Sequence, residues 1–229
     1  MPIECKEVRN MSKKKKRRRK LTPLGKITVV LLLSSLVFLI LTVRNHIGEQ
    51  EVQEESQEQI QLKNEELYRM AQDVYDEIIN DSMTQMQKAY AIYDWARTNI
   101  HYSGDEPITT WEDAAFYAFK YGEGDCYNFF SATKILLKMA GIDNIDVVKS
   151  DRSQSSHFWS LINLGDGWYH FDCTPRSTGG HFFMLTDVEL EAYSLANGNS
   201  HVFAHDRYPE RATQSVQHLV DYEAGIIYQ

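Results

Sequence analysis

The stretch that decides the fold is GDCYNFFSATKILLKMAG, residues 124–141. Counted from Cys126, apolar side chains recur after 3, 4, 10, 11 and 14 residues, which predicts a helix with one buried face. Asp125 is a typical N-terminal cap, and Gly141 is a typical C-terminal stop. The free backbone N–H groups and the dipole at a helix N-terminus favour the anionic, nucleophilic form of a thiol. Cys126 is therefore either an activated nucleophile or an ordinary buried cysteine.

The charge of the chain is divided unevenly along its length. The net charge is −8 over 229 residues, but residues 1–44 hold 12 Lys and Arg against two acids. The rest of the chain therefore holds 12 basic and 30 acidic residues, a balance of −18. Because such an acidic domain repels a phosphate backbone, we expect no nucleic-acid partner. Three cysteines are too few for a disulfide framework.

An apolar segment follows the basic N-terminus. Residues 27–43 carry no charge, are rich in Val, Leu, Ile and Phe, and lie between Lys26 and Arg44. At about 1.5 Å per residue, a helix of this length nearly crosses a hydrocarbon layer of about 30 Å. A cleaved signal peptide is the alternative, but its apolar run is usually about 7–15 residues long and is followed by a small-residue cleavage site, which is missing here. We therefore predict one transmembrane helix at 27–43 in the cell membrane, with the basic segment 1–26 in the cytoplasm and the C-terminal domain extracytoplasmic.

The rest of the chain divides into a polar stalk and a folded domain. Residues 44–65 are rich in Glu and Gln, which is typical of a solvated helix or a disordered stalk. Residues 66–229 contain the patterns of a folded domain. Helices are expected at about 66–80, 84–100, 111–119 and 126–140, strands at about 145–148, 157–164, 168–173 and 182–187, and a last helix at 189–195. Helices followed by strands are typical of the α+β class, here with the thiol-bearing helix packed on an antiparallel sheet.

Two of the expected strands bring a histidine and an aspartate to one face of the sheet. If the numbers of paired residues sum to 329, His157 lies directly opposite Asp172. A two-residue turn at 166–167 gives a sum of 333, which keeps both residues on the same face. Either register allows a shared site. Cys173 then points to the opposite face, where we expect it to be packed and not bonded to Cys126.

A thiol, an imidazole and a carboxylate together can form a nucleophilic triad. Cys126 would attack a carbonyl, His157 would take and later return the proton, and Asp172 would orient the ring and stabilise its charged form. Each residue taken alone also fits a structural role, and His170 is a rival imidazole on the face of Asp172. Asp125 by itself would raise the pKa of the thiol, although a capping carboxylate is directed at backbone N–H groups.

Three motifs in this order resemble the transglutaminase-like superfamily, whose core is similar to that of papain-like cysteine proteases. The motifs are GEGDC at 122–126, HFW at 157–159 and WYHFDCTP at 168–175. The resemblance covers about residues 66–187. It implies a papain/transglutaminase-like core in which Cys126, His157 and Asp172 are the nucleophile, the base and the orienting acid.

The sequence therefore predicts an extracytoplasmic thiol enzyme that is anchored by one transmembrane helix. The enzyme would transfer the acyl group of a protein or peptide substrate through a thioester to an amine or to water. The alternatives are a cysteine protease or amidase that acts on surface or cell-wall peptides, and a catalytically silent binding module on the same fold. We expect no cofactor and no metal, since the sequence contains no cofactor motif and no EF-hand-like loop for the calcium that some animal relatives use. A single anchor without a wall-sorting signal suggests a bacterial surface protein.

Overall fold

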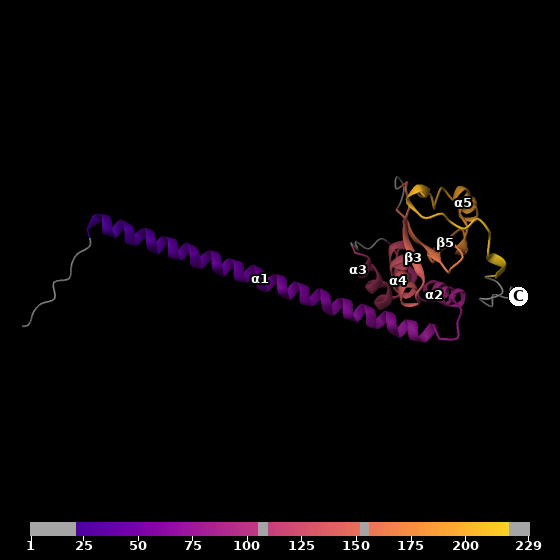
Figure 1. Ribbon diagram of the computed structural model, residues 1–229, viewed down its shortest axis with the longest axis horizontal. Helices are drawn as coiled ribbons and strands as arrows, with labels where there is room; N and C mark the ends of the chain where they lie inside the picture. The colour runs from indigo at the N-terminus through magenta and orange to yellow at the C-terminus, as the bar shows by residue number, and fades with distance from the viewer. Residues whose placement is uncertain (1–21, 105–109, 152–155, 220–229) are drawn as a thin grey trace, which may run out of the picture. The chain divides into compact units, whose positions relative to one another are not determined.

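Two units make up the chain. The computed structural model describes residues 22–104, 110–151 and 156–219. Contacts between Cα atoms divide the chain between Glu58 and Gln59, and the long helix α1 (Pro23–Ile78) contributes to both units (Figure 1). The basic residues 1–21 lie outside the described part of the chain, so their predicted cytoplasmic position stays a prediction.

Helix α1 contains the predicted membrane segment. An 18-residue window in it has a mean hydropathy of 2.5, and none of that window is buried. Its large side chains are exposed, as at Leu31 (62%) and Phe38 (70%). Among the described helices α1 is the one with the length and composition to cross a membrane, and a signal sequence has the same properties. Residues 44–65 also lie within α1, so this polar segment is helical.

The second unit has helices followed by strands, as predicted for the α+β class. Its helices after α1 are α2 (Gln85–Asn99), α3 (Trp111–Tyr121), α4 (Cys126–Met139), α5 (Asp187–Ala196) and a 3-10 turn, η1 (His205–Arg207). Strands β3 (Asp143–Val148), β4 (Phe158–Asn163), β5 (Trp168–Asp172) and β6 (Phe182–Leu185) form one antiparallel sheet in that order. The two-residue strands β1 (His101–Tyr102) and β2 (Glu123–Gly124) form a separate parallel pair, for which the sequence has no recognisable signal.

Helix α4 begins at Cys126, as predicted, because the two residues that flank its first turn cap each other. The Asp125 carboxylate accepts the backbone N–H groups of Tyr127 (2.8 Å) and Asn128 (3.4 Å). In return, the side-chain oxygen of Asn128 accepts the backbone N–H of Asp125 at 2.9 Å. This capping box satisfies donors that a helix N-terminus would otherwise leave free, and it holds Cys126 as the first helical residue.

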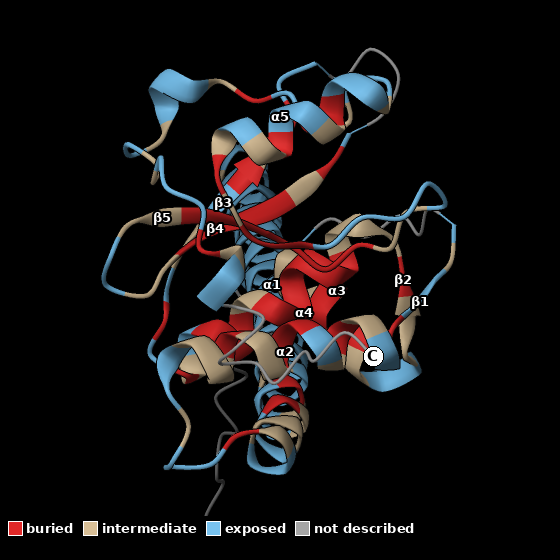
Figure 2. Ribbon diagram, turned by 90° about the vertical axis from the view of Figure 1, so that its right-hand side faces the viewer, coloured by how far each residue is buried: buried red, intermediate tan, exposed pale blue. Residues whose placement is uncertain are grey.

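The prediction of a single buried face on α4 was wrong. The helix packs against α2 and α3 as well as β3 and β4, and most of it is buried (Figure 2). Even Ser131 and Thr133 are only 0% and 2% exposed. Thr133 can be buried because its hydroxyl donates to the carbonyl of Phe129 at 2.9 Å. A pattern of apolar residues cannot reveal small polar residues that are buried in this way.

Both predicted registers of the β4–β5 hairpin were wrong, although the predicted faces were right. The structure pairs Leu161 with His170, a sum of 331, and continuing this register places Asp172 opposite Trp159. The cause is a four-residue loop at 164–167. Its conformation is stabilised by the side chain of Asn163, whose oxygen accepts the N–H groups of Gly165 (2.8 Å) and Gly167 (3.3 Å). The change of register by two residues preserves the alternation of side chains between faces.

The glycine before the capping residue should tolerate no side chain. Gly124 has a φ of +152°, and a Cβ there would lie 2.2 Å from Cγ of Asn128. We expect Gly124→Ala to lower the free energy of unfolding by about 2–4 kcal/mol, since it adds backbone strain and displaces a capping side chain. Chemical denaturation measures this loss. Gly141→Ala is the matched control, because Gly141 also has a positive φ (+68°) but open space around it. Equal losses in the two variants would contradict a role for the Asn128 contact.

Candidate active site

Cys126 lies at the N-terminus of α4, beside the first residue of β4. Its side chain is partly buried and forms no disulfide. The backbone N–H of Phe158 is directed at the thiol, and the rings of Phe158 and Tyr127 are 4.7 Å apart. Phe158 directly follows His157, and the charges of Asp172 and Arg176 both act on the thiol, so Cys126 lies near the predicted acid.

The surroundings of Cys126 disfavour its anionic form. Burial, followed by the negative charge of Asp125, raises the pKa of Cys126 to about 12. The Phe158 N–H and the charge of Arg176 act in the opposite direction but are weaker. The capping interactions of Asp125 therefore do not cancel its effect on the neighbouring thiol. Because this pKa lies well above neutrality, Cys126 is a thiol at neutral pH.

This thiol should show its raised pKa in alkylation. The rate of Cys126 modification by iodoacetamide should rise about tenfold per pH unit up to at least about pH 9, because only the thiolate reacts and its fraction grows below the pKa. Mass spectrometry of the Cys126 peptide measures this rate over a range of pH. A rate that reaches a plateau near pH 7 would contradict a resting neutral thiol. A plain cysteine peptide, with an ordinary pKa near 8.5, is the control.

The predicted base and acid form a buried pair. Nε2 of His157 lies 2.7 Å from Oδ2 of Asp172, and the two residues are each only 3% exposed. The other carboxylate oxygen, Oδ1, accepts the backbone N–H of Thr174 at 2.8 Å. Burial alone would raise the pKa of Asp172, but the charge and hydrogen bond of His157, together with those of His201, hold it well below its ordinary value. Asp172 is therefore an ionised acceptor, and Nδ1 is the ring nitrogen of His157 that it does not contact.

The rival imidazole is bound to a different carboxylate. Nδ1 of His170 accepts the indole N–H of Trp159 at 3.0 Å, and its Nε2 lies 2.9 Å from Oδ1 of Asp187. Burial lowers the pKa of His170 despite the carboxylate of Asp187. Both ring nitrogens are thus occupied, and His170 has no free nitrogen to serve as a base. Cys173, also as predicted, is a buried free thiol on the other face of β5.

Two residues that the sequence analysis did not include also reach the His157–Asp172 pair. Nε2 of His201 lies 3.0 Å from Oδ2 of Asp172, and the guanidinium Nη2 of Arg176 lies 2.6 Å from Nε2 of His157. His157 cannot donate from Nε2 to Asp172 and accept there from Arg176 at once, so these two contacts compete. Neither residue belongs to a periodic pattern. His201 lies beyond the last predicted helix at 189–195, and no local signal could have identified it.

The same side chains also have to be considered as a metal site. Donor atoms of His157, Asp172 and His201 lie within 4.8 Å of one another. However, Nη2 of Arg176 is 3.8 Å from Oδ2 of Asp172 and closer still to His157, so a permanent positive charge lies where a cation would bind. The donor set therefore fits a proton-transfer network better than a cation.

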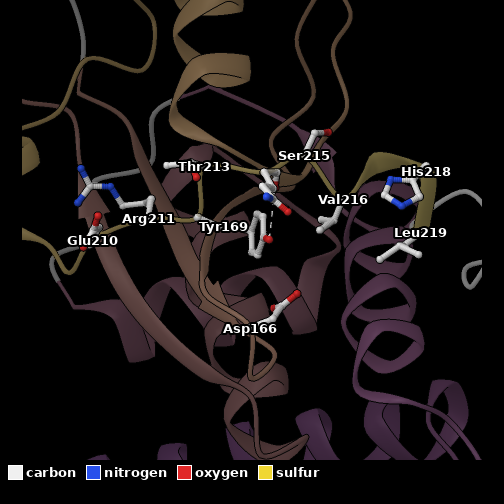
Figure 3. A pocket seen from close by; sticks show the side chains of 11 residues that line it. Asp166, Tyr169, Glu210, Arg211, Thr213, Ser215, Val216, His218 and Leu219 are labelled. Carbon is white, nitrogen blue, oxygen red and sulfur yellow. Dashed lines mark hydrogen bonds between the residues drawn. The ribbon is translucent and has the colours of Figure 1, made fainter.

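A separate hollow lies beside the β4–β5 hairpin. It has a volume of about 570 Å³ and is lined by residues of the β4–β5 hairpin and of the C-terminal segment, among them Asp166, Tyr169 and Arg211 (Figure 3). The hydroxyl of Tyr169 donates to the carbonyl of Gln214 at 3.4 Å. Tyr169 and Asp172 are three residues apart on β5, so their side chains point to opposite faces. This hollow is therefore distinct from the candidate active site.

Comparison with known proteins shows which family this core is similar to. Residues 72–173 match the family model of the transglutaminase-like superfamily. A "Putative Cysteine Protease from Cytophaga hutchinsonii" is 22% identical, with 48% of this chain and 37% of that chain covered and a TM-score of 0.33. A structure described as "a TGase" is 12% identical, with 59% of this chain and 44% of that chain covered and a TM-score of 0.39. This chain thus spans less than half the length of either structure, and no curated protein sequence matches it. Residues 72–173, which include Cys126, His157 and Asp172, are thus similar to the transglutaminase-like superfamily.

Proposed function

We propose that the second unit is a cysteine acyltransferase or amide hydrolase that acts on protein or peptide substrates. The observation that carries this proposal is the buried 2.7 Å pair of His157 and Asp172 beside a thiol at a helix N-terminus. A carboxylate, an imidazole and a thiol in this order can activate the thiol and stabilise the imidazolium that forms.

The chemistry begins with the thiol. Sγ of Cys126 attacks the carbonyl carbon of an amide, such as a glutamine side chain or a peptide bond, while its proton passes to Nδ1 of His157. The capping box takes up the N–H groups of Tyr127 and Asn128, so the backbone N–H of Cys126 is the donor at this terminus that would stabilise the oxyanion. The C–N bond then breaks, and the leaving ammonia or amine takes the proton from His157. Cys126 is left as a thioester.

The second half of the reaction decides between transfer and hydrolysis. An amine or a water molecule attacks the thioester carbonyl, and His157 takes the proton of this acceptor and gives it to the departing thiolate of Cys126. Asp172 holds the ring throughout and stabilises its charged form. An amine acceptor gives a new amide bond, whereas water gives a carboxylic acid.

An assay of acceptor choice tests this proposal. The full-length chain in detergent is incubated with a glutamine-containing peptide, with and without a fluorescent primary amine. We expect release of ammonia in both cases and incorporation of the amine when it is present. Absence of a thioester to Cys126, of ammonia release and of peptide cleavage across a peptide library would contradict the proposal.

We further propose that residues 27–43 anchor the enzyme and that its acidic domain lies outside the cell. This proposal rests on the apolar helix and on the basic residues that precede it. Protease added to intact cells should degrade the domain but spare an N-terminal tag, which should remain in the membrane fraction. A domain that is protected in intact cells and degraded only after lysis would contradict the orientation. Loss of the tag by cleavage would instead indicate a signal peptide.

A further inference from the structure

His201 is a second imidazole on the carboxylate of the candidate triad. It belongs to the segment after α5, 29 residues from Asp172 in the sequence. Its side chain is fully buried, and its Nε2 lies 3.0 Å from Oδ2 of Asp172. The same oxygen is 2.7 Å from Nε2 of His157. Oδ2 of Asp172 therefore faces two imidazoles at once.

The position and the tautomer of His201 are both determined by its neighbours. Its backbone N–H donates to Oγ of Ser194 at 3.0 Å, and its Nδ1 lies 2.9 Å from Oγ of Ser200. Burial lowers the pKa of His201 despite the nearby carboxylate, so the ring is neutral at neutral pH. A neutral ring has one N–H, and the ionised Asp172 cannot donate. Nε2 of His201 therefore carries the hydrogen, and Nδ1 accepts from Ser200.

The ring also packs directly against the catalytic group. The His201 ring meets the His157 ring edge to face, with centroids 5.0 Å apart at 88°, and it meets Trp159 at 5.3 Å and 74°. A rotation of the Asp172 carboxylate toward either imidazole would lengthen its bond to the other. His201 thus restrains both the carboxylate and, through it, the orientation of His157.

We propose that His201 is a positioning residue that anchors Asp172 and thereby sets the geometry and the charge that His157 experiences. This inference rests on the proposed function. The bond from His201 removes negative charge from Oδ2, so less of that charge acts on His157. Without it, more of the negative charge of Oδ2 acts on the ring of His157.

A pocket lies behind the buried ring of His201. His201 is part of the wall of a pocket of about 200 Å³ that is also lined by Glu191, Ser194, Leu195, Asn199, Val202 and His205. Removal of the side chain would open a route from this pocket to Asp172. Because the pocket is larger than an imidazole ring, free imidazole can take the place of the missing side chain.

Several charged and titratable groups surround His201, and each of them can contribute to how activity depends on pH. Asp172 comes from β5, His157 precedes β4 and Arg176 follows β5, and all three affect the titration of His201. His170 on β5 also interacts with it. Glu191 and His205 line the pocket behind it.

Replacement of His170 provides the matched control, because His170 is also a buried histidine but binds Asp187 and not Asp172.

The test compares rates, pH profiles and chemical rescue in the full-length chain. In His201→Ala we expect a fall in kcat of about 10- to 100-fold with little change in KM, and an acidic limb of the rate profile that moves to higher pH. Imidazole at millimolar concentration should restore a large part of the rate. His201→Gln, whose amide can donate to Asp172, should retain more activity than His201→Phe, which fills the space without a donor. His170→Ala should show neither rescue nor a moved limb.

Each outcome has a distinct meaning. If the wild-type chain has no turnover, or if Cys126→Ala retains it, the proposed function fails. If turnover needs Cys126 but His201→Phe and His201→Gln have wild-type rates and profiles, the inference about His201 alone is wrong. The inference about His201 is also wrong if His201→Phe and His201→Gln lose activity equally and the acidic limb of their pH–rate profiles stays at the wild-type position. That pattern indicates a purely structural role. Should His201→Ala fail to fold by circular dichroism, the Gln and Phe variants decide the question.

Discussion

Cys126→Ala should abolish turnover and thioester formation while the protein stays folded. Removal of the nucleophile of a covalent mechanism costs at least about 10³-fold in kcat, because the remaining binding groups and oxyanion donors cannot replace it. Cys126 is partly exposed and the capping box is formed by Asp125 and Asn128, so loss of its sulfur should change the free energy of unfolding by less than about 1 kcal/mol.

The control for this experiment is the second described cysteine. Cys173 is 3% exposed and lies next to Asp172, yet its side chain points to the opposite face of β5. Cys173→Ala should therefore keep kcat within a few-fold of wild type. Turnover can be followed by ammonia release and by amine incorporation, and the thioester by intact mass. Full activity in Cys126→Ala would refute the thiol mechanism, and a cellular function that survives it would favour the binding module.

Asp172→Asn should lower kcat by about 10³- to 10⁴-fold, because the amide cannot provide the acceptors and the charge that the carboxylate supplies. Three donors converge on Asp172, namely His157, His201 and the backbone N–H of Thr174. An asparagine has one oxygen, so its NH₂ group would face at least one of these donors. His157 would then lose the partner that orients its ring and stabilises its charged form.

The same substitution should change how stability depends on pH. The pKa of Asp172 is depressed in the folded protein, so its ionised form stabilises the fold above the ordinary pKa of about 3.9, and this contribution is lost as the pH falls toward the folded value. Asp172→Asn should therefore be less stable at pH 7 but should lose less further stability between about pH 5 and pH 3. Urea denaturation at several pH values measures this difference.

Asp166→Asn provides the control for Asp172→Asn. Asp166 is exposed in the loop between β4 and β5, on the same hairpin. Its replacement should leave kcat and the acid dependence of stability close to wild type. If both variants lost activity equally, the effect would come from the hairpin and not from the carboxylate of Asp172.

Much of the candidate site could be predicted because its signals are local. The cap at Asp125 and the thiol at Cys126 are adjacent in the sequence, and a capping box needs only residues within one turn. The faces of His157 and Asp172 follow from the alternation of side chains along strands, which survives a change of register by two. These signals depend on neighbouring residues and not on the rest of the fold.

Other features depend on groups that are distant in the sequence. The register in which paired residue numbers sum to 331 depends on a hydrogen bond from the backbone of Gly165 to the side chain of Asn163. The sequence was compatible with two other glycine-containing turns. The raised pKa of Cys126 results from burial, and burial is decided by how α4 packs. The position of Cys126 at a helix N-terminus, taken alone, indicated a lowered pKa.

The sequence by itself thus determined the helix that begins at Cys126, the order of helices and strands, and the shared face of His157 and Asp172. These follow from periodicity and capping, which act over a few residues. Only the tertiary structure decided that α4 is buried on most of its surface, that the resting thiol is neutral and that His201 binds Asp172. Each of these depends on segments folding against one another, and desolvation and hydrogen bonds between such segments leave no local pattern.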